Sequence, residues 1–162
     1  MAVVAVATAA FGLVNLAHAE MTADSKLSAN DKKFVMQASK AGMSEVANAK
    51  MAEEKATDEA TKKVAARLIK DHTAANERLQ EIAKEENLDL SQVEPKKMEF
   101  SGDKQYLTMV QKHHQKDIAM FEKEANDEKA GEDRDVPKFA RETLPTLKEH
   151  LAMINDALAK LK

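Results

Sequence analysis

Residues 65–82 read AARLIKDHTAANERLQEI, and this stretch decides the fold that the sequence predicts. Its apolar residues recur at spacings of three and four, which is the period of one face of an α-helix. A helix with one apolar stripe is stable in water only when the stripe packs against another element. A histidine interrupts this stripe, so the sequence predicts a packed helix with an imidazole on its inward face: Ala65, Leu68, His72, Ala75, Leu79 and Ile82.

The composition extends this prediction to the whole chain of 162 residues. Only four Gly, three Pro and one Tyr occur, there is no Trp, and Ala, Lys, Glu and Met are abundant, which is typical of an all-α domain. The absence of Cys excludes disulfides, thiolate metal sites and cysteine nucleophiles. A formal net charge of -3 offers no electrostatic basis for binding nucleic acid, and the sequence identifies neither a protein partner nor an oligomeric state.

Capping residues and the ends of the apolar stripes divide the chain into four helices. Pro145 lies inside the last of them, where it removes one helical hydrogen bond and is expected to bend the axis. We expect the helices to run from Ser28 to near Lys55, from Thr57 to near Asn87, from Asp103 to a turn at Gly131, and from Asp135 through Leu161.

Four helices with one apolar stripe each can bury those stripes only against one another, which predicts a four-helix bundle. The first and third links are short and force antiparallel pairs. The middle link, residues 88–102, lacks periodicity and contains Pro95. It can span about 50 Å when extended, so the pattern allows it either to fold back locally or to cross the bundle from end to end.

Residues 1–19 contain no charged side chain and end on Ala17-His18-Ala19, as in the apolar region and cleavage site of a secretory signal. The apolar run is shorter than the ~20 residues needed to span a bilayer, and no later run retains the protein in a membrane. We therefore expect a signal peptide at 1–19, a polar lead-in at 20–27, the helical domain at 28–162, and a periplasmic or secreted location.

Four polar residues fall near the midpoints of the inward stripes: Glu45, His72, His114 and His150. Helix midpoints stay at one depth whichever way each helix runs, so we expect one central layer. Two interpretations stay open, because buried polar groups need partners. The layer is either a closed hydrogen-bond network or a site for a single Zn, Cu or Fe ion. No Glu-x-x-His motif occurs, which disfavours a two-iron centre.

Three further residues flank this layer. Asp71 is placed to orient a histidine of a neighbouring helix, and His113 with Asp117, four residues apart, can form an outer pair. All three also fit solvated charges at the edge of a stripe. No phosphate loop, Gly-x-Ser-x-Gly elbow or His-Glu-x-x-His motif is present, so the sequence indicates no catalytic residues.

Three motifs occur in order along the chain: ATDEATKKVAARLIKDHTAANERL (56–79), YLTMVQKHHQKDIAMFEKEA (106–125) and FARETLPTLKEHLAMI (139–154). In these motifs the chain resembles the bacterial domain of unknown function 4142 family. The resemblance implies an exported, ferritin-like helical bundle whose middle link crosses the bundle. The family's acid, Asp-His, His and final His fall here on Glu45, Asp71-His72, His114 and His150, and His113 stands where the family commonly has Asp.

Three hypotheses for function follow. The first is a non-enzymatic, exported bundle whose central layer binds one transition-metal ion or serves as a structural network. The second is a metal-dependent oxidase or peroxide-consuming enzyme that uses the same layer. The third is a stress-linked envelope protein that acts through its charged outer faces, although dense Lys and Glu on a helix are ordinarily solvated surface.

Overall fold

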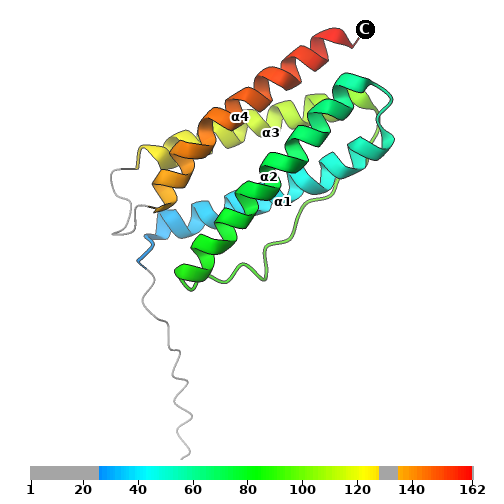
Figure 1. Cartoon of the computed structure of the whole chain (residues 1–162). Helices are drawn as coiled ribbons and strands as arrows, with labels where there is room; N and C mark the ends of the chain where they lie inside the picture. The colour runs from blue at the N-terminus through cyan, green and yellow to red at the C-terminus, as the bar shows by residue number, and fades with distance from the viewer. Residues whose placement is uncertain (1–25, 128–134, 162) are drawn as a thin grey trace, which may run out of the picture.

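The computed structural model describes residues 26–127 and 135–161 and has four α-helices and no strand in these ranges. The helices are α1 (Ala29–Lys55), α2 (Glu59–Glu85), α3 (Asp103–Ala125) and α4 (Asp135–Lys160), and they form a bundle (Figure 1). The all-α four-helix prediction is confirmed. The expected signal peptide at 1–19, most of the lead-in and the turn at Gly131 lie outside the described residues.

The starts of the first two helices follow from their capping residues. Ser28 and Asp31 form a capping box, in which the Ser28 Oγ accepts from the Asp31 N–H at 3.1 Å and the Asp31 carboxylate accepts from the Ser28 N–H at 2.9 Å. Asp58 caps α2 by accepting from the Thr61 N–H at 2.8 Å. Helix α3 follows Gly102, whose φ of 130° is accessible to glycine.

The helices pair as two antiparallel hairpins. Helix α1 packs closely on α2 and α3 on α4, while α2 also packs against α4 and α1 touches α3 more sparsely. The cyclic order around the bundle is therefore α1, α2, α4, α3. The α1/α3 side is the least tightly closed of the four.

The middle link runs the length of the bundle (Figure 1). At its start the Glu86 carboxylate accepts from the Lys26 N–H at 2.7 Å, beside the beginning of α1. At its end Asp103 accepts from the Thr57 hydroxyl at 2.8 Å, beside the α1/α2 turn. Of the two routes that the sequence allowed, the chain takes the one from end to end.

Two buried polar residues of α1 hold this link in place. The Ser44 hydroxyl accepts from the Lys96 N–H at 2.8 Å, and the Asn48 side-chain oxygen accepts from the Met98 N–H at 2.9 Å. Asn48 also donates to the Lys96 carbonyl at 3.2 Å. Because these bonds satisfy backbone groups of an extended segment, they fix the link against α1.

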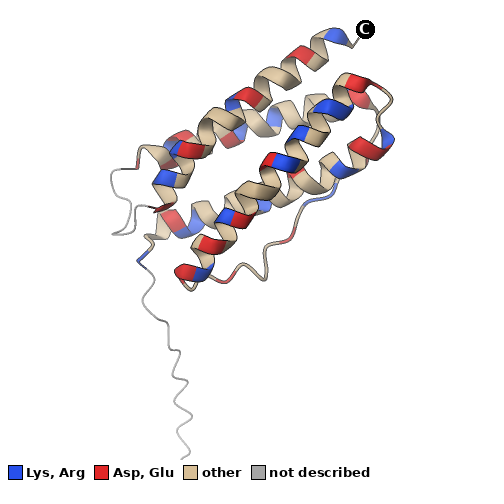
Figure 2. Cartoon of the chain, viewed as in Figure 1, with Lys and Arg blue, Asp and Glu red and all other residues tan. Residues whose placement is uncertain are grey.

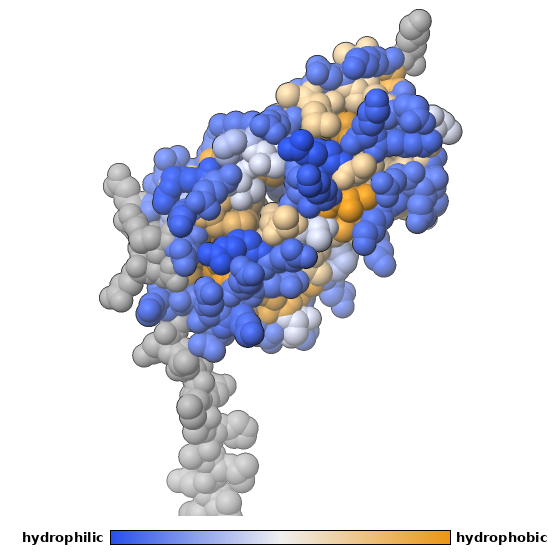
Figure 3. Space-filling model, in the orientation of Figure 1, coloured by the Kyte–Doolittle hydropathy of each residue, from blue (hydrophilic) through white to orange (hydrophobic). Residues whose placement is uncertain are grey.

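The core consists of two apolar clusters. One surrounds Phe34 and Phe121, whose rings meet edge to face at 4.9 Å, and the other surrounds Leu68 and Ile154. Charged residues occur along all four helices (Figure 2), and hydrophilic residues cover most of the face shown in Figure 3. Among the described helices, none combines the length and apolarity required to cross a bilayer. Helix α4 continues through Pro145 without interruption.

Candidate metal centre

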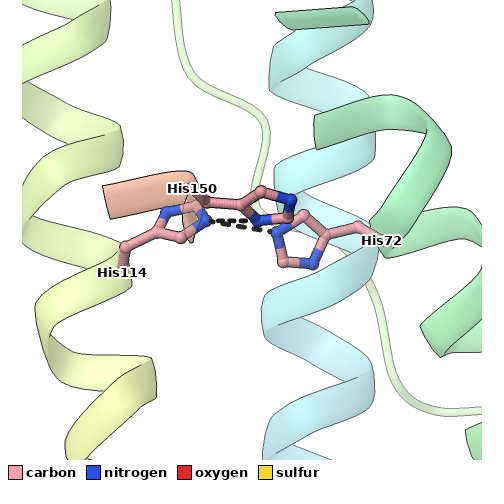
Figure 4. Close-up of side chains that lie close together, drawn as sticks. All are labelled: His72, His114 and His150. Atoms are coloured by element: carbon pink, nitrogen blue, oxygen red, sulfur yellow. Dashed lines mark hydrogen bonds between the residues drawn. The ribbon is translucent and has the colours of Figure 1, made fainter. Parts of the chain in front are cut away.

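Three histidines converge between the two apolar clusters, one from each of α2, α3 and α4 (Figure 4). His72, His114 and His150 are 6%, 0% and 1% exposed. The Nε2 atoms of His72 and His114 are 3.4 Å apart, and the His114 Nε2 lies 3.3 Å from the His150 Nδ1. One nitrogen from each ring lies within 4.8 Å of the other two. The structure thus brings together three of the four residues expected in the central layer.

The outer nitrogens of two of these rings are bound to groups that can only accept hydrogen bonds. His114 Nδ1 lies 2.9 Å from the Val110 carbonyl oxygen, and His150 Nε2 lies 2.9 Å from the Asp71 carboxylate. Each outer nitrogen must therefore carry the hydrogen. A neutral imidazole carries only one N–H, so the inner nitrogens, His114 Nε2 and His150 Nδ1, carry no hydrogen. Their lone pairs face each other.

Asp71 is held ionised by its neighbours. It hydrogen-bonds to Arg67, one turn earlier on α2, as well as to His150. Burial on its own would raise the pKa of Asp71, but the hydrogen bonds from Arg67 and His150 outweigh burial and leave the pKa below its ordinary value. Asp71 therefore orients a histidine of a neighbouring helix, one of the two roles considered for it. The i, i+4 spacing of Arg67 and Asp71 was an available signal for this ion pair.

Burial keeps the three rings uncharged. It lowers the pKa of His72 to about 3, with the two neighbouring histidines contributing in the same direction, and it also lowers the pKa of His114 and of His150. At neutral pH the cluster therefore contains three neutral imidazoles. His72 can donate to His114 Nε2, but no hydrogen bond can link His114 to His150 unless one outer bond breaks. A shared cation satisfies both lone pairs at once.

Glu45, the fourth residue expected in the layer, has a different partner. It is 1% exposed, and its Oε1 accepts a hydrogen bond from His113 Nδ1 at 2.9 Å. Its Oε2 is buried and has no hydrogen-bond partner in the described part of the chain. The structure therefore places Glu45 beside the three-histidine cluster and not among its nitrogens, because neighbouring residues of α3 point in different directions and His113 reaches α1.

His113 pairs with Glu45 and not with Asp117, the outer partner that the sequence suggested. The hydrogen bond and charge of Glu45 raise the pKa of His113. Asp117 is half-buried one turn further along α3, and burial followed by the nearby Glu45 charge raises its pKa to about 7. Glu45 thus takes the hydrogen bond that the sequence suggested for Asp117, while Asp117 lies beside both residues.

Comparison with known proteins yields a family and no individual relative. Neither the curated proteins nor the solved structures contained a match to this chain. One family model, described as Domain of unknown function (DUF4142), matches residues 16–157, which include all four helices except the end of α4. With most of its length matched by that model, the chain belongs to the DUF4142 family.

Proposed function

We propose that the protein binds one transition-metal ion through His72 Nε2, His114 Nε2 and His150 Nδ1. The observation that carries this proposal is the pair of opposed lone pairs on His114 and His150, which are 3.3 Å apart. Their outer hydrogen bonds, to Val110 and Asp71, prevent them from bonding to each other. A cation between the rings converts this unfavourable contact into two coordinate bonds.

The spacing of the nitrogens favours a tetrahedral ion such as zinc. With metal–nitrogen bonds of about 2.0–2.1 Å, a tetrahedron places neighbouring ligand atoms about 3.3–3.4 Å apart, whereas an octahedron with the same bonds places them about 2.9 Å apart. The two distances here are 3.4 and 3.3 Å. Both are long for a hydrogen bond between nitrogens, and both match a tetrahedral edge, while the remaining pair of nitrogens, from His72 and His150, lies within 4.8 Å.

The groups behind the ligands fit the same role. Metal-bound histidines usually donate their second N–H to a carboxylate or a backbone carbonyl, which orients the ring and makes the ligand nitrogen more basic. His150 donates in this way to Asp71, and His114 donates to Val110. Three neutral histidines with two such braces form a donor set for Zn²⁺ or Cu⁺.

We place the protein among binding proteins and not among oxidases. Helical two-iron enzymes draw on several carboxylates, whereas the donor cluster in the described residues consists of three histidines. We further propose that the bundle is ferritin-like and that the protein is exported to the periplasm, as the uncharged segment 1–19 suggests. Cell fractionation with an antibody against the helical domain tests the location, and retention in the cytoplasm would refute it.

Metal titration tests the site. Apo protein is mixed with Zn²⁺, Cu⁺ or Fe²⁺ while the thermal unfolding and the stoichiometry are followed. An ion that binds only the folded state should stabilise it by about 2.7 kcal/mol at 100 times its dissociation constant. We expect one ion per chain, loss of binding in His72→Ala, and retention in the matched control His113→Ala. The proposal fails if no ion raises the melting temperature, or if both variants bind equally.

A further inference from the structure

The two sides of the histidine cluster are packed differently along the bundle axis. One helical turn away, toward the start of α3, lies a layer of four fully buried apolar residues: Ala49, Leu68, Val110 and Ile154. Such a layer leaves no room for a ligand and supplies no polar group. A metal ion held by the three histidines cannot extend its coordination in that direction.

On the opposite side, one turn away, the packing is incomplete. A cavity of about 20 Å³ is lined by His72 together with Gly42, Asn76 and Asp117. This space is sufficient for one water molecule, or for the outer end of a small ligand whose first atom is bound at the histidine cluster. The Asn76 Oδ1 is buried and has no hydrogen-bond partner in the described residues. A water in the cavity can donate to that oxygen, so both volume and polarity fit a small polar occupant beside His72.

The cavity adjoins a groove on the outside of the molecule. This groove, of about 600 Å³, lies on the sparsely packed α1/α3 side and shares Ala41 and Asp117 with the wall of the cavity. Three lysines from three segments line it: Lys40 of α1, Lys96 of the middle link and Lys116 of α3. None of them forms a salt bridge within the described ranges.

The position of Lys96 is fixed by hydrogen bonds between its backbone and α1. The buried Ser44 accepts from the Lys96 N–H at 2.8 Å, and the buried Asn48 donates to the Lys96 carbonyl at 3.2 Å. These bonds hold the link where the side chain of Lys96 lines the groove. The carboxylates of Glu45 and Asp117 also line the groove. The three lysines outnumber them, and the excess of positive charge raises the local concentration of anions.

Resting on the metal site proposed above, we propose that the fourth coordination position faces the cavity and binds water or a small anion of two or three atoms that arrives through the α1/α3 groove. Three neutral histidines bring no negative charge of their own to the ion, which favours an anionic fourth ligand. The small cavity excludes bulky anions. The ligand passes between Ala41 and Asp117, the two residues that line both the groove and the cavity.

Cobalt(II) provides the test, because its visible absorption depends on the number and kind of its ligands. The full-length protein is loaded with Co²⁺, and azide is added while the spectrum is recorded; sulfate serves as the bulky control anion. We expect azide to change the spectrum with saturation at one per chain and sulfate to leave it unchanged. We also expect azide association to slow as the salt concentration rises.

Two variants narrow the path at different points. A methyl group on Gly42 would overlap the Asn76 side-chain oxygen, so Gly42→Ala adds volume to the cavity wall and displaces the Asn76 side chain that also lines it. Ala41→Leu fills the boundary between groove and cavity, and Ala47→Leu, which lines a different groove on the same helix, is its matched control. We expect azide affinity to fall at least tenfold in Gly42→Ala and Ala41→Leu, and Co²⁺ to remain bound in all three.

The charge of the opening is tested in the same assay. Replacing Lys40 and Lys116 together by Gln should lower the azide association rate at least threefold and reduce its salt dependence, whereas Lys50→Gln, elsewhere on α1, should not. If Co²⁺ does not bind, the metal site itself is refuted. If Co²⁺ binds but azide leaves the spectrum unchanged, or binds equally to Ala41→Leu and Ala47→Leu, the metal site stands and the ligand path is refuted. Should Gly42→Ala fail to fold, Ala41→Leu decides alone.

Discussion

Removal of the Asp71 carboxylate should weaken metal binding without removing a ligand. In Asp71→Ala, the His150 Nε2–H loses its acceptor. Nothing then keeps the hydrogen on Nε2, so the ring can adopt the tautomer in which Nδ1 carries the hydrogen and cannot bind a metal. Loss of such a brace usually lowers metal affinity 10- to 100-fold. Arg67 binds the same carboxylate oxygen and offsets part of its charge. We therefore expect the lower half of that range, about 10- to 30-fold, which corresponds to about 1.4–2 kcal/mol.

The same variant should be less stable without metal. His150 is 1% exposed, so its Nε2–H, left without the Asp71 acceptor, has little access to water. A buried donor without a partner costs about 1–3 kcal/mol, and the exposed part of the Arg67 pair adds little. Urea denaturation of the apo protein measures this loss, and competition with a chromophoric chelator measures the metal affinity.

Glu149→Ala is the matched control. Glu149 also accepts from Arg67, at 3.3 Å, but it is largely exposed and does not hydrogen-bond to His150. We expect its metal affinity to stay within threefold of the wild type and its stability to change by less than about 0.5 kcal/mol. Nitrogen NMR of the histidine rings should show a changed tautomer balance at His150 only in Asp71→Ala. Equal losses in both variants, or an unchanged affinity in Asp71→Ala, would refute the bracing role.

Three further predictions concern the fold. Leu68→Ala should lower the unfolding free energy by about 2–5 kcal/mol in urea denaturation, because it leaves a hole beside the histidines. Asn48→Ala should speed proteolysis within the middle link, because both of its bonds to that link are lost. Burial and the neighbouring Asp31 raise the pKa of Glu124 from 4.5 to about 7, so the folded state binds the proton more tightly and wild-type stability falls as the pH rises between those values. Glu124→Gln should gain stability relative to the wild type over that window and no further above it, as measured by thermal unfolding; a constant difference would contradict the assignment.

The helices were predictable because their signals are local. Helices α1 and α2 start within two residues of the expected Ser28 and Thr57, because Ser28 caps α1 and Asp58 caps α2. Helix α3 ends at Ala125, and no strong helix breaker in the sequence marks that residue; the turn expected at Gly131 lies outside the described residues. In α4 the fully buried positions include His150 and Ala157, while Leu151 and Leu158, which the same apolar stripe also allows to face inward, are half-buried. Both sets fit a period of 3.6, and packing against two neighbouring helices chooses between them.

The depth of the candidate site was predictable, but the direction of each side chain was not. Midpoint positions place Glu45 and the histidines at one level in any antiparallel bundle. Successive residues of a helix point about 100° apart, so His113 and His114 must face different neighbours. Which neighbour each one meets depends on the rotation of α3 about its axis relative to α1 and α4, which spacing does not determine. The pairing of Glu45 with His113 is therefore a property of the packed bundle.

The arrangement of protons in the central layer bears on why the layer exists. Well-packed apolar side chains often stabilise a core as much as a buried polar network does, or more, and apolar clusters already lie on both sides of this layer. A network built for stability would alternate donors and acceptors. Here the donors of His114 and His150 point outward to Val110 and Asp71, and the acceptors are left facing each other. Facing lone pairs are unfavourable in the metal-free protein and favourable around a cation. This is expected of a binding site in which the bound ion stabilises the arrangement of the ligands.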